Sequence, residues 1–178
     1  MPISPLAPTA FPDLPVIRGV RFAAAQAGVK YQNRDDVMLA VLDAGSAIAG
    51  VFTTSKTRAA SVLDCEAKIG KTSGAPAAIL VNSGNANAFT GKAGFDSVDR
   101  LTAKIATATQ VPQDRVFTSS TGVIGEALPD DRIADQLTTL TENLSDNALP
   151  DVARAIMTTD TFPTVSYTHL TLPTICSV

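Results

Sequence analysis

Ala77-Ala78-Ile79-Leu80-Val81-Asn82-Ser83-Gly84-Asn85-Ala86-Asn87-Ala88-Phe89-Thr90-Gly91 is the stretch of this 178-residue chain that decides its fold. The five apolar residues at its start predict a buried β-strand. Residues 82–91 hold three Asn, one Ser and two Gly, and loops that leave strand ends often bind ligands. Small residues allow the backbone to approach a ligand, and amides both donate and accept hydrogen bonds. Taken alone, this segment fits either a binding loop or an ordinary turn-rich connection.

Composition limits the class of protein. The length suits one domain, or a large part of one, and the core must be built from Ala, Val, Ile and Leu because only 5% of residues are aromatic. The net charge is −3 and the pI is about 5.0. No cluster of Lys and Arg is dense enough to neutralise a phosphate backbone, so we expect no nucleic-acid partner.

The reactive residue types are few. Two Cys, Cys65 and Cys176, do not make a disulfide framework, and a single His, His169, argues against a metal site built on histidines. We therefore expect no metal, and we interpret Cys65 as a buried structural thiol.

Residues 1–8 lack the charged and apolar regions of a secretory signal, and no apolar run approaches the length of a membrane span. The expected location is the cytoplasm, away from membranes.

The remaining patterns predict a mixed α/β fold. Residues 1–15 contain five Pro and are expected to be extended. Asp43-Ala44-Gly45-Ser46 is predicted to be a hairpin turn between two strands. In the polar segment Thr53–Arg58, Lys56 and Arg58 could meet an anion, although a solvated loop is favoured. The predicted strands are 38–42, 47–52, 77–81 and 115–118, and the predicted helices are 96–109, 129–144 and 151–157.

A second polar cluster follows the strand predicted at 115–118. It reads Thr118-Ser119-Ser120-Thr121-Gly122-Val123-Ile124-Gly125. The hydroxyl of Thr121 and the unobstructed backbone N–H of Gly122 are two neighbouring donors, as an oxyanion site needs. A third cluster, Met157-Thr158-Thr159-Asp160-Thr161, ends the last predicted helix.

Together these clusters resemble the ornithine acetyltransferase family of arginine biosynthesis, also called glutamate N-acetyltransferase or the ArgJ family. The resemblance rests on four segments, which follow the family's order and spacing over roughly residues 8 to 163: Ser55-Lys56-Thr57-Arg58, Asn82 to Gly91, Ser120-Thr121-Gly122-Val123-Ile124-Gly125 and Met157 to Thr161. The implied fold is a layered α/β sandwich of the ornithine acetyltransferase type, incomplete without a second chain.

The resemblance also implies a reaction and its residues. Members move an acetyl group from N-acetyl-L-ornithine to L-glutamate through an acetyl-enzyme, without a cofactor, and some accept acetyl-CoA as donor. The precursor cleaves itself before a Thr into α and β chains that stay associated, with an α2β2 heterotetramer expected. The new N-terminal Thr is the nucleophile, and its own amine takes the hydroxyl proton. By the match, Thr121 and Gly122 form the oxyanion hole and Thr158 contacts the substrate.

This chain departs from the family pattern in two places. No Lys-Gly pair followed by an Ala-Thr cleavage bond occurs in the 178 residues, so residues 1–163 correspond to an α chain without its nucleophile. We expect this chain alone to be inactive and poorly soluble.

The second departure is at the end of the chain. Where the family would place Lys after Phe162-Pro163, this chain has Thr164. Residues 164–178 carry no Asp, Glu, Lys or Arg, and we interpret this anomalous tail as a sequencing or assembly artefact, the alternative being a divergent tail. His169 and Cys176 therefore receive no functional role.

Two other functions stay open on the sequence. One is a related self-processing amidase or aminopeptidase that uses an N-terminal nucleophile on peptides. The other is a non-catalytic module that binds small molecules, which would leave the Thr121-Gly122 turn unexplained.

Overall fold

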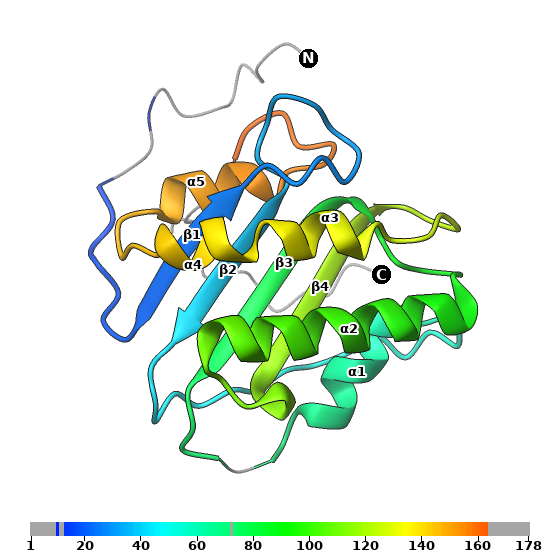
Figure 1. The fold of residues 1–178 in the computed structure, drawn as a ribbon, viewed down its shortest axis with the longest axis horizontal. Helices are drawn as coiled ribbons and strands as arrows, with labels where there is room; N and C mark the ends of the chain where they lie inside the picture. Colours follow the sequence, from blue (N-terminus) through cyan, green and yellow to red (C-terminus); the bar gives the residue numbers. More distant parts are fainter. Residues whose placement is uncertain (1–9, 11–12, 72, 164–178) are drawn as a thin grey trace, which may run out of the picture.

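The computed structural model describes residue 10, residues 13–71 and residues 73–163. Its centre is one four-stranded sheet in the order β1-β2-β3-β4 (Figure 1). The strands are β1 (Val20–Ala25), β2 (Val37–Leu42), β3 (Ala77–Asn85) and β4 (Val116–Val123). β1–β2 and β2–β3 are antiparallel, whereas β3–β4 is parallel. Since parallel strands end at one edge of a sheet, the polar residues at the ends of β3 and β4 are brought together there.

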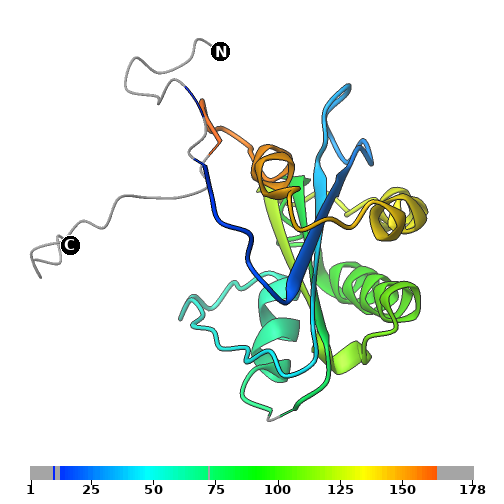
Figure 2. The same cartoon turned by 90° about the vertical axis from the view of Figure 1, so that its left-hand side faces the viewer.

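The hydrophobic core lies between one face of the sheet and three helices (Figure 2). These are α2 (Gly91–Thr109), α3 (Asp130–Asp135) and α4 (Leu137–Glu142). Alternate strand residues such as Leu39 and Leu80 point into this layer, where Leu101 and Ile105 recur at helical spacing on α2. All four are at most 2% exposed. The period-two strands and the period-3.6 helix thus bury matching apolar faces.

The opposite face of the sheet is covered only in part. α1 (Ala60–Lys68) packs beside β4, and α5 (Leu149–Ala155) packs over β1 and β2 (Figure 2). The strand residues whose side chains alternate toward this face include Val81, Ser119 and Thr121, none of which is buried. Within the described residues, no helix is long and apolar enough to span a bilayer.

One sequence prediction is wrong. The turn at Asp43–Ser46 forms, with Ser46 N donating to Asp43 O, but Ala47–Phe52 is not a strand. Both edges of β2 are already occupied by β1 and β3, so this segment finds no partner and runs as mostly exposed chain toward α1. The true hairpin partner of β2 is β1, which the sequence analysis missed, as it missed α1.

The other predicted elements are confirmed with changed bounds. α2 begins five residues before Asp96, and the predicted helix 129–144 divides at Gln136 into α3 and α4. β3 and β4 each continue into the polar residues that were predicted to be loops. The tail at 164–178 and most of the proline-rich start lie outside the described residues.

Candidate functional site

The ends of β3 and β4 meet through two glycines. Gly84 pairs with Gly122, and Ser83 pairs with Thr121. Both glycines have positive φ, 101° and 137°. A Cβ on Gly122 would lie 2.3 Å from the carbonyl carbon of Gly84 and 2.6 Å from the nitrogen of Asn85. Only glycine allows this contact between the two backbones, which fixes where the Thr121–Gly122 peptide lies.

Thr121 presents a free hydroxyl at this edge. Its side chain is half-buried and makes no hydrogen bond with a described residue, whereas Ser120, its neighbour, donates to Asn82 Oδ1 at 2.7 Å. Ser120 and Thr121 lie on opposite faces of β4. The bond to Asn82 therefore anchors Ser120 toward the α2 side and leaves Thr121 on the partly covered face.

The asparagines at the end of β3 and just beyond it have structural partners. Asn82 Nδ2 donates to Asn85 O (2.9 Å), Asn85 Nδ2 donates to Glu126 O (3.1 Å), and Asn87 Nδ2 donates to Gly94 O (3.1 Å). All three side chains are at most 3% exposed. The binding-loop interpretation of these amides is not supported by their geometry, because they satisfy buried backbone carbonyls and join β3 to α2 and to the segment after β4.

The third predicted cluster is tied to the same part of the sheet. Ser83 Oγ donates to Ala155 O at 2.8 Å, which fixes the end of α5 over β3. Arg34 Nη2 donates to Met157 O (2.6 Å), and its guanidinium stacks 4.3 Å from the centroid of the Tyr31 ring. Beyond this anchor the half-buried Thr158 begins a turn in which its N–H donates to Asp160 Oδ2 at 3.0 Å.

The connection between β1 and β2 depends on one buried carboxylate. Asp36 is fully buried and accepts hydrogen bonds from the backbone N–H groups of Ala27 (2.7 Å), Gly28 (3.3 Å) and Val29 (2.6 Å). This connection carries Arg34 and Lys30, which contact the Thr158 segment and Gly84. Sequence reasoning missed Asp36 and Arg34 because a single Asp or Arg in a loop is not distinctive.

We expect Asp36→Asn to lower the free energy of unfolding by about 2 kcal/mol, because an amide replaces one charged acceptor with a donor that faces buried N–H groups. Urea unfolding of the variant measures this.

Asp35→Asn is the matched control for Asp36→Asn. Burial, and then the nearby Asp151 and Asp36 carboxylates, raise the pKa of Asp35, so the folded chain disfavours its charge at neutral pH. Removing that charge should leave stability unchanged or slightly higher, and equal losses for both variants would contradict the prediction.

Arg34→Met should release the end of α5. Loss of a charged donor to the carbonyl of Met157 is expected to make amide exchange in residues 154–158 about tenfold faster. Hydrogen-exchange mass spectrometry checks this. Arg132→Met is the control, because Arg132 makes a similar bond, Nη1 to Gly28 O at 2.9 Å, away from α5. Unchanged exchange at 154–158 in Arg34→Met would show that Arg34 does not hold the segment.

The polar segment Thr53–Arg58 is a loop, as favoured from the sequence. Ser55 and Thr57 bond to each other, and Arg58 forms an ion pair with Glu66 on α1. The loop borders a cavity of about 220 Å³ with Phe89 and Phe95. The loop therefore lies beside the C-terminal end of the 82–91 segment. Its ion-paired cation, Arg58, is directed toward α1.

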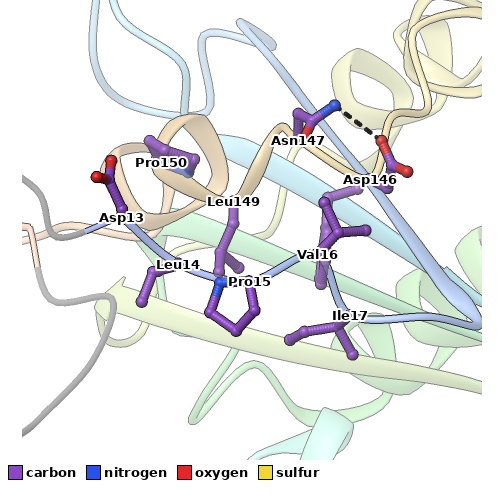
Figure 3. Close-up of a pocket in the computed structure, with 10 residues that line it drawn as sticks. Asp13, Leu14, Pro15, Val16, Ile17, Asp146, Asn147, Leu149 and Pro150 are labelled. Carbon is purple, nitrogen blue, oxygen red and sulfur yellow. Dashed lines mark hydrogen bonds between the residues drawn. The ribbon is translucent and has the colours of Figure 1, made fainter.

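Two other features lie apart from the candidate site. A cavity of about 310 Å³ between residues 13–17 and the start of α5 is mainly apolar, and Asn147 bonds to Asp146 beside it (Figure 3). None of the predicted site residues lines it. Cys65 is half-buried and donates to Thr118 O at 3.3 Å; burial raises the pKa of its thiol, which favours the predicted structural role.

Comparisons with known proteins identify the family of this chain. The model of the ArgJ family matches residues 21–178. The chain is 64% identical over 160 residues to the arginine biosynthesis bifunctional protein ArgJ of Ruegeria pomeroyi, and 52% identical over 165 residues to that of Bradyrhizobium diazoefficiens. These matches cover 90% and 92% of this chain but only 39% of each relative.

Two solved structures share the fold. The crystal structure of the ArgJ protein from Bacillus halodurans aligns with a TM-score of 0.73 and 34% identity, covering 82% of this chain and 75% of that one. The ornithine acetyltransferase of Mycobacterium tuberculosis, solved with ornithine, aligns with a TM-score of 0.74 and 32% identity, over 80% and 77% of the two chains. The layered α/β fold expected from the sequence is thereby confirmed, and the chain belongs to the ArgJ family.

Proposed function

We propose that this chain forms the oxyanion hole and part of the substrate site of a cytoplasmic acetyltransferase that moves an acetyl group from N-acetyl-L-ornithine to L-glutamate. The observation that carries the proposal is the Gly84–Gly122 contact, which places Thr121 and Gly122 at the end of a parallel strand pair. Family membership supplies the reaction class.

The proposed chemistry divides between this chain and a nucleophile outside it. An N-terminal Thr, activated by its own amine, attacks the acetyl carbonyl of the donor, and ornithine leaves with a proton. The oxygen of the tetrahedral intermediate becomes negative, and the Thr121 hydroxyl and the Gly122 N–H stabilise it. Glutamate then takes the acetyl group from the enzyme. Thr158 contacts the amino-acid part of the substrate, and acetyl-CoA is a possible second donor.

The surface of the chain supports a partner. Among the described residues, the large apolar side chains at least 47% exposed are Val16, Ile17, Val51, Phe89, Phe95 and Ile124. Ile124 lies just beyond Gly122, and Gly125 N donates to Ala88 O, which brings the Phe89 segment beside it. An exposed apolar surface next to a candidate site is typical of a protein interface. We propose that the β chain covers it in an α2β2 assembly.

This proposed interface has a measurable consequence. The 178-residue chain purified alone should aggregate at high concentration, and co-expression with the remainder of its precursor should give a monodisperse complex. Light scattering after size-exclusion chromatography checks this. A monodisperse monomer of the chain alone at high concentration would contradict it.

The deciding experiment for the function compares two proteins. The complete precursor and this chain alone are incubated with N-acetyl-L-ornithine and L-glutamate, and N-acetylglutamate is measured by mass spectrometry. We expect turnover by the complete protein and none by the chain. Hydrolysis of small peptides without acetyl transfer would favour a self-processing amidase, and acetylornithine binding without any transfer would favour a binding module. Replacing acetylornithine by acetyl-CoA shows whether the second donor is used.

A further inference from the structure

Arg115 is a buried cation without a carboxylate partner among the described residues. It ends the short 3-10 helix η1 (Gln113–Arg115) immediately before β4 and is only 5% exposed. Its Nη2 donates to Ser46 O (2.9 Å) and Ala75 O (3.2 Å). Nε is buried with no acceptor, Nη1 has no described partner, and no ion pair joins the guanidinium to a described Asp or Glu.

This arrangement is costly without a compensating anion. A guanidinium stays charged at any physiological pH and carries five N–H donors, of which two carbonyls here satisfy only part. Removing such a charge from water is unfavourable unless an opposite charge or a full set of acceptors replaces the lost solvation. If Arg115 served only to hold the turn at residues 43–46 in place, its two hydrogen bonds to backbone carbonyls would be sufficient. An uncharged donor could make those two bonds.

Arg115 lines a cavity of about 290 Å³ at the edge of the sheet where β2 ends and β3 and β4 begin. The cavity is lined by the turn after β2, by the residues that follow α1, and by Arg115 itself. Lys71 stands exposed at its rim, and the half-buried Ser73 contributes a hydroxyl. No described Asp or Glu lines it, so every charged group on its described wall is positive.

We propose that this cavity binds an oxyanion, a carboxylate or phosphate group, with Arg115 and Lys71 supplying the charge and Ser73 a hydroxyl donor. The site is separate from the candidate active site. Arg115 precedes the first residue of β4, whereas Thr121 and Gly122 are near its end, a separation of roughly 20 Å along the strand. The anion has two possible sources, a small molecule in solution or an acidic group of the remainder of the precursor.

Thermal unfolding with inorganic phosphate tests the proposal. The 178-residue chain, kept dilute, is titrated with phosphate at constant ionic strength, with chloride as the balancing salt so that general screening cancels. We expect the melting temperature to rise and saturate with phosphate. The apparent Kd should increase about tenfold or more in Arg115→Gln, because one charged hydrogen-bonding group is lost. Lys71→Ala, an exposed change that should not disturb folding, should weaken binding by a smaller factor.

The same titration on the complete precursor identifies the source. Phosphate binding retained there would indicate a small-molecule site. Binding seen in the chain but lost in the complete protein would indicate that a carboxylate of the remaining sequence occupies the cavity. The proposal fails if phosphate and chloride act alike on the chain, or if Lys71→Ala and the folded Arg115→Gln variant both respond as the parent does. The readout does not depend on acetyl transfer, so it is independent of the proposed function.

Discussion

Gly122→Ala should destabilise this chain more than any other single substitution proposed for it, by on the order of 4 kcal/mol. The added methyl would sit 2.3 Å from the carbonyl carbon of Gly84 and 2.6 Å from its oxygen. These are backbone atoms of the paired strand, so no side-chain rotation relieves the contact. The φ of 137° adds conformational strain. Either the strands separate at their ends or the chain does not fold.

Gly125→Ala is the matched control for this effect. Gly125 also has positive φ, 83°, but nothing lies within 4 Å of the position that an added methyl would take. Its cost should be only the backbone strain, about 1–2 kcal/mol. Urea or thermal unfolding of both variants separates the two contributions. Similar losses for the two would mean that strain, and not the contact with Gly84, accounts for the glycine at 122.

Thr121→Val in the complete protein should reduce kcat by about 10²–10³-fold, as expected when one donor of an oxyanion hole is removed. Val has nearly the shape of Thr and is well tolerated in strands, and the Thr121 hydroxyl makes no hydrogen bond within the described chain. Stability should therefore change little. KM for N-acetylornithine should stay close to the parent value, because the lost interaction develops only as the oxygen becomes charged.

Ser119→Ala is the control on the same strand and face. Ser119 is exposed, two residues before Thr121, and outside the proposed oxyanion hole. Its removal should leave kcat within about twofold. If Thr121→Val retains full kcat while the parent is active, Thr121 is not an oxyanion donor. If the parent itself is inactive, the proposed function fails first, and the two results are thus distinguishable.

The sequence predicted the helices in which apolar residues recur at regular helical spacing. The stripe of Leu101 and Ile105 gave α2, and Ile133, Leu137 and Leu140 gave the helical region that became α3 and α4. It missed α1 because Ala59 provides no side-chain cap, and residues 60–68 bury only Ala60 and Ser61 fully. The false strand at 47–52 has apolar residues, but pairing depends on a free sheet edge, which local sequence does not report.

The candidate site was predictable in part. Its clusters were linked to one function only through their resemblance to a family, and the parallel register of β3 and β4 is what brings two of them together in space. For the asparagines the sequence left a binding loop and a turn-rich connection open, because a polar run at the end of a strand gives no sign of whether its amides meet a ligand or the protein backbone. Gly84, Asp36 and Arg34 act through distant segments, and such contacts become visible only in three dimensions.

The return of the chain to its first strand has a consequence for biosynthesis. Phe22 and Ser145 exchange backbone hydrogen bonds, and α5 then packs on β1 and β2. The segment that carries Thr158 is thus held by residues made more than a hundred positions earlier. Long-range contacts of this kind form late. During translation, β1 to β4 can pair before the ribosome releases residues 145–157, so the edge that holds Thr121 should remain unfinished until they emerge.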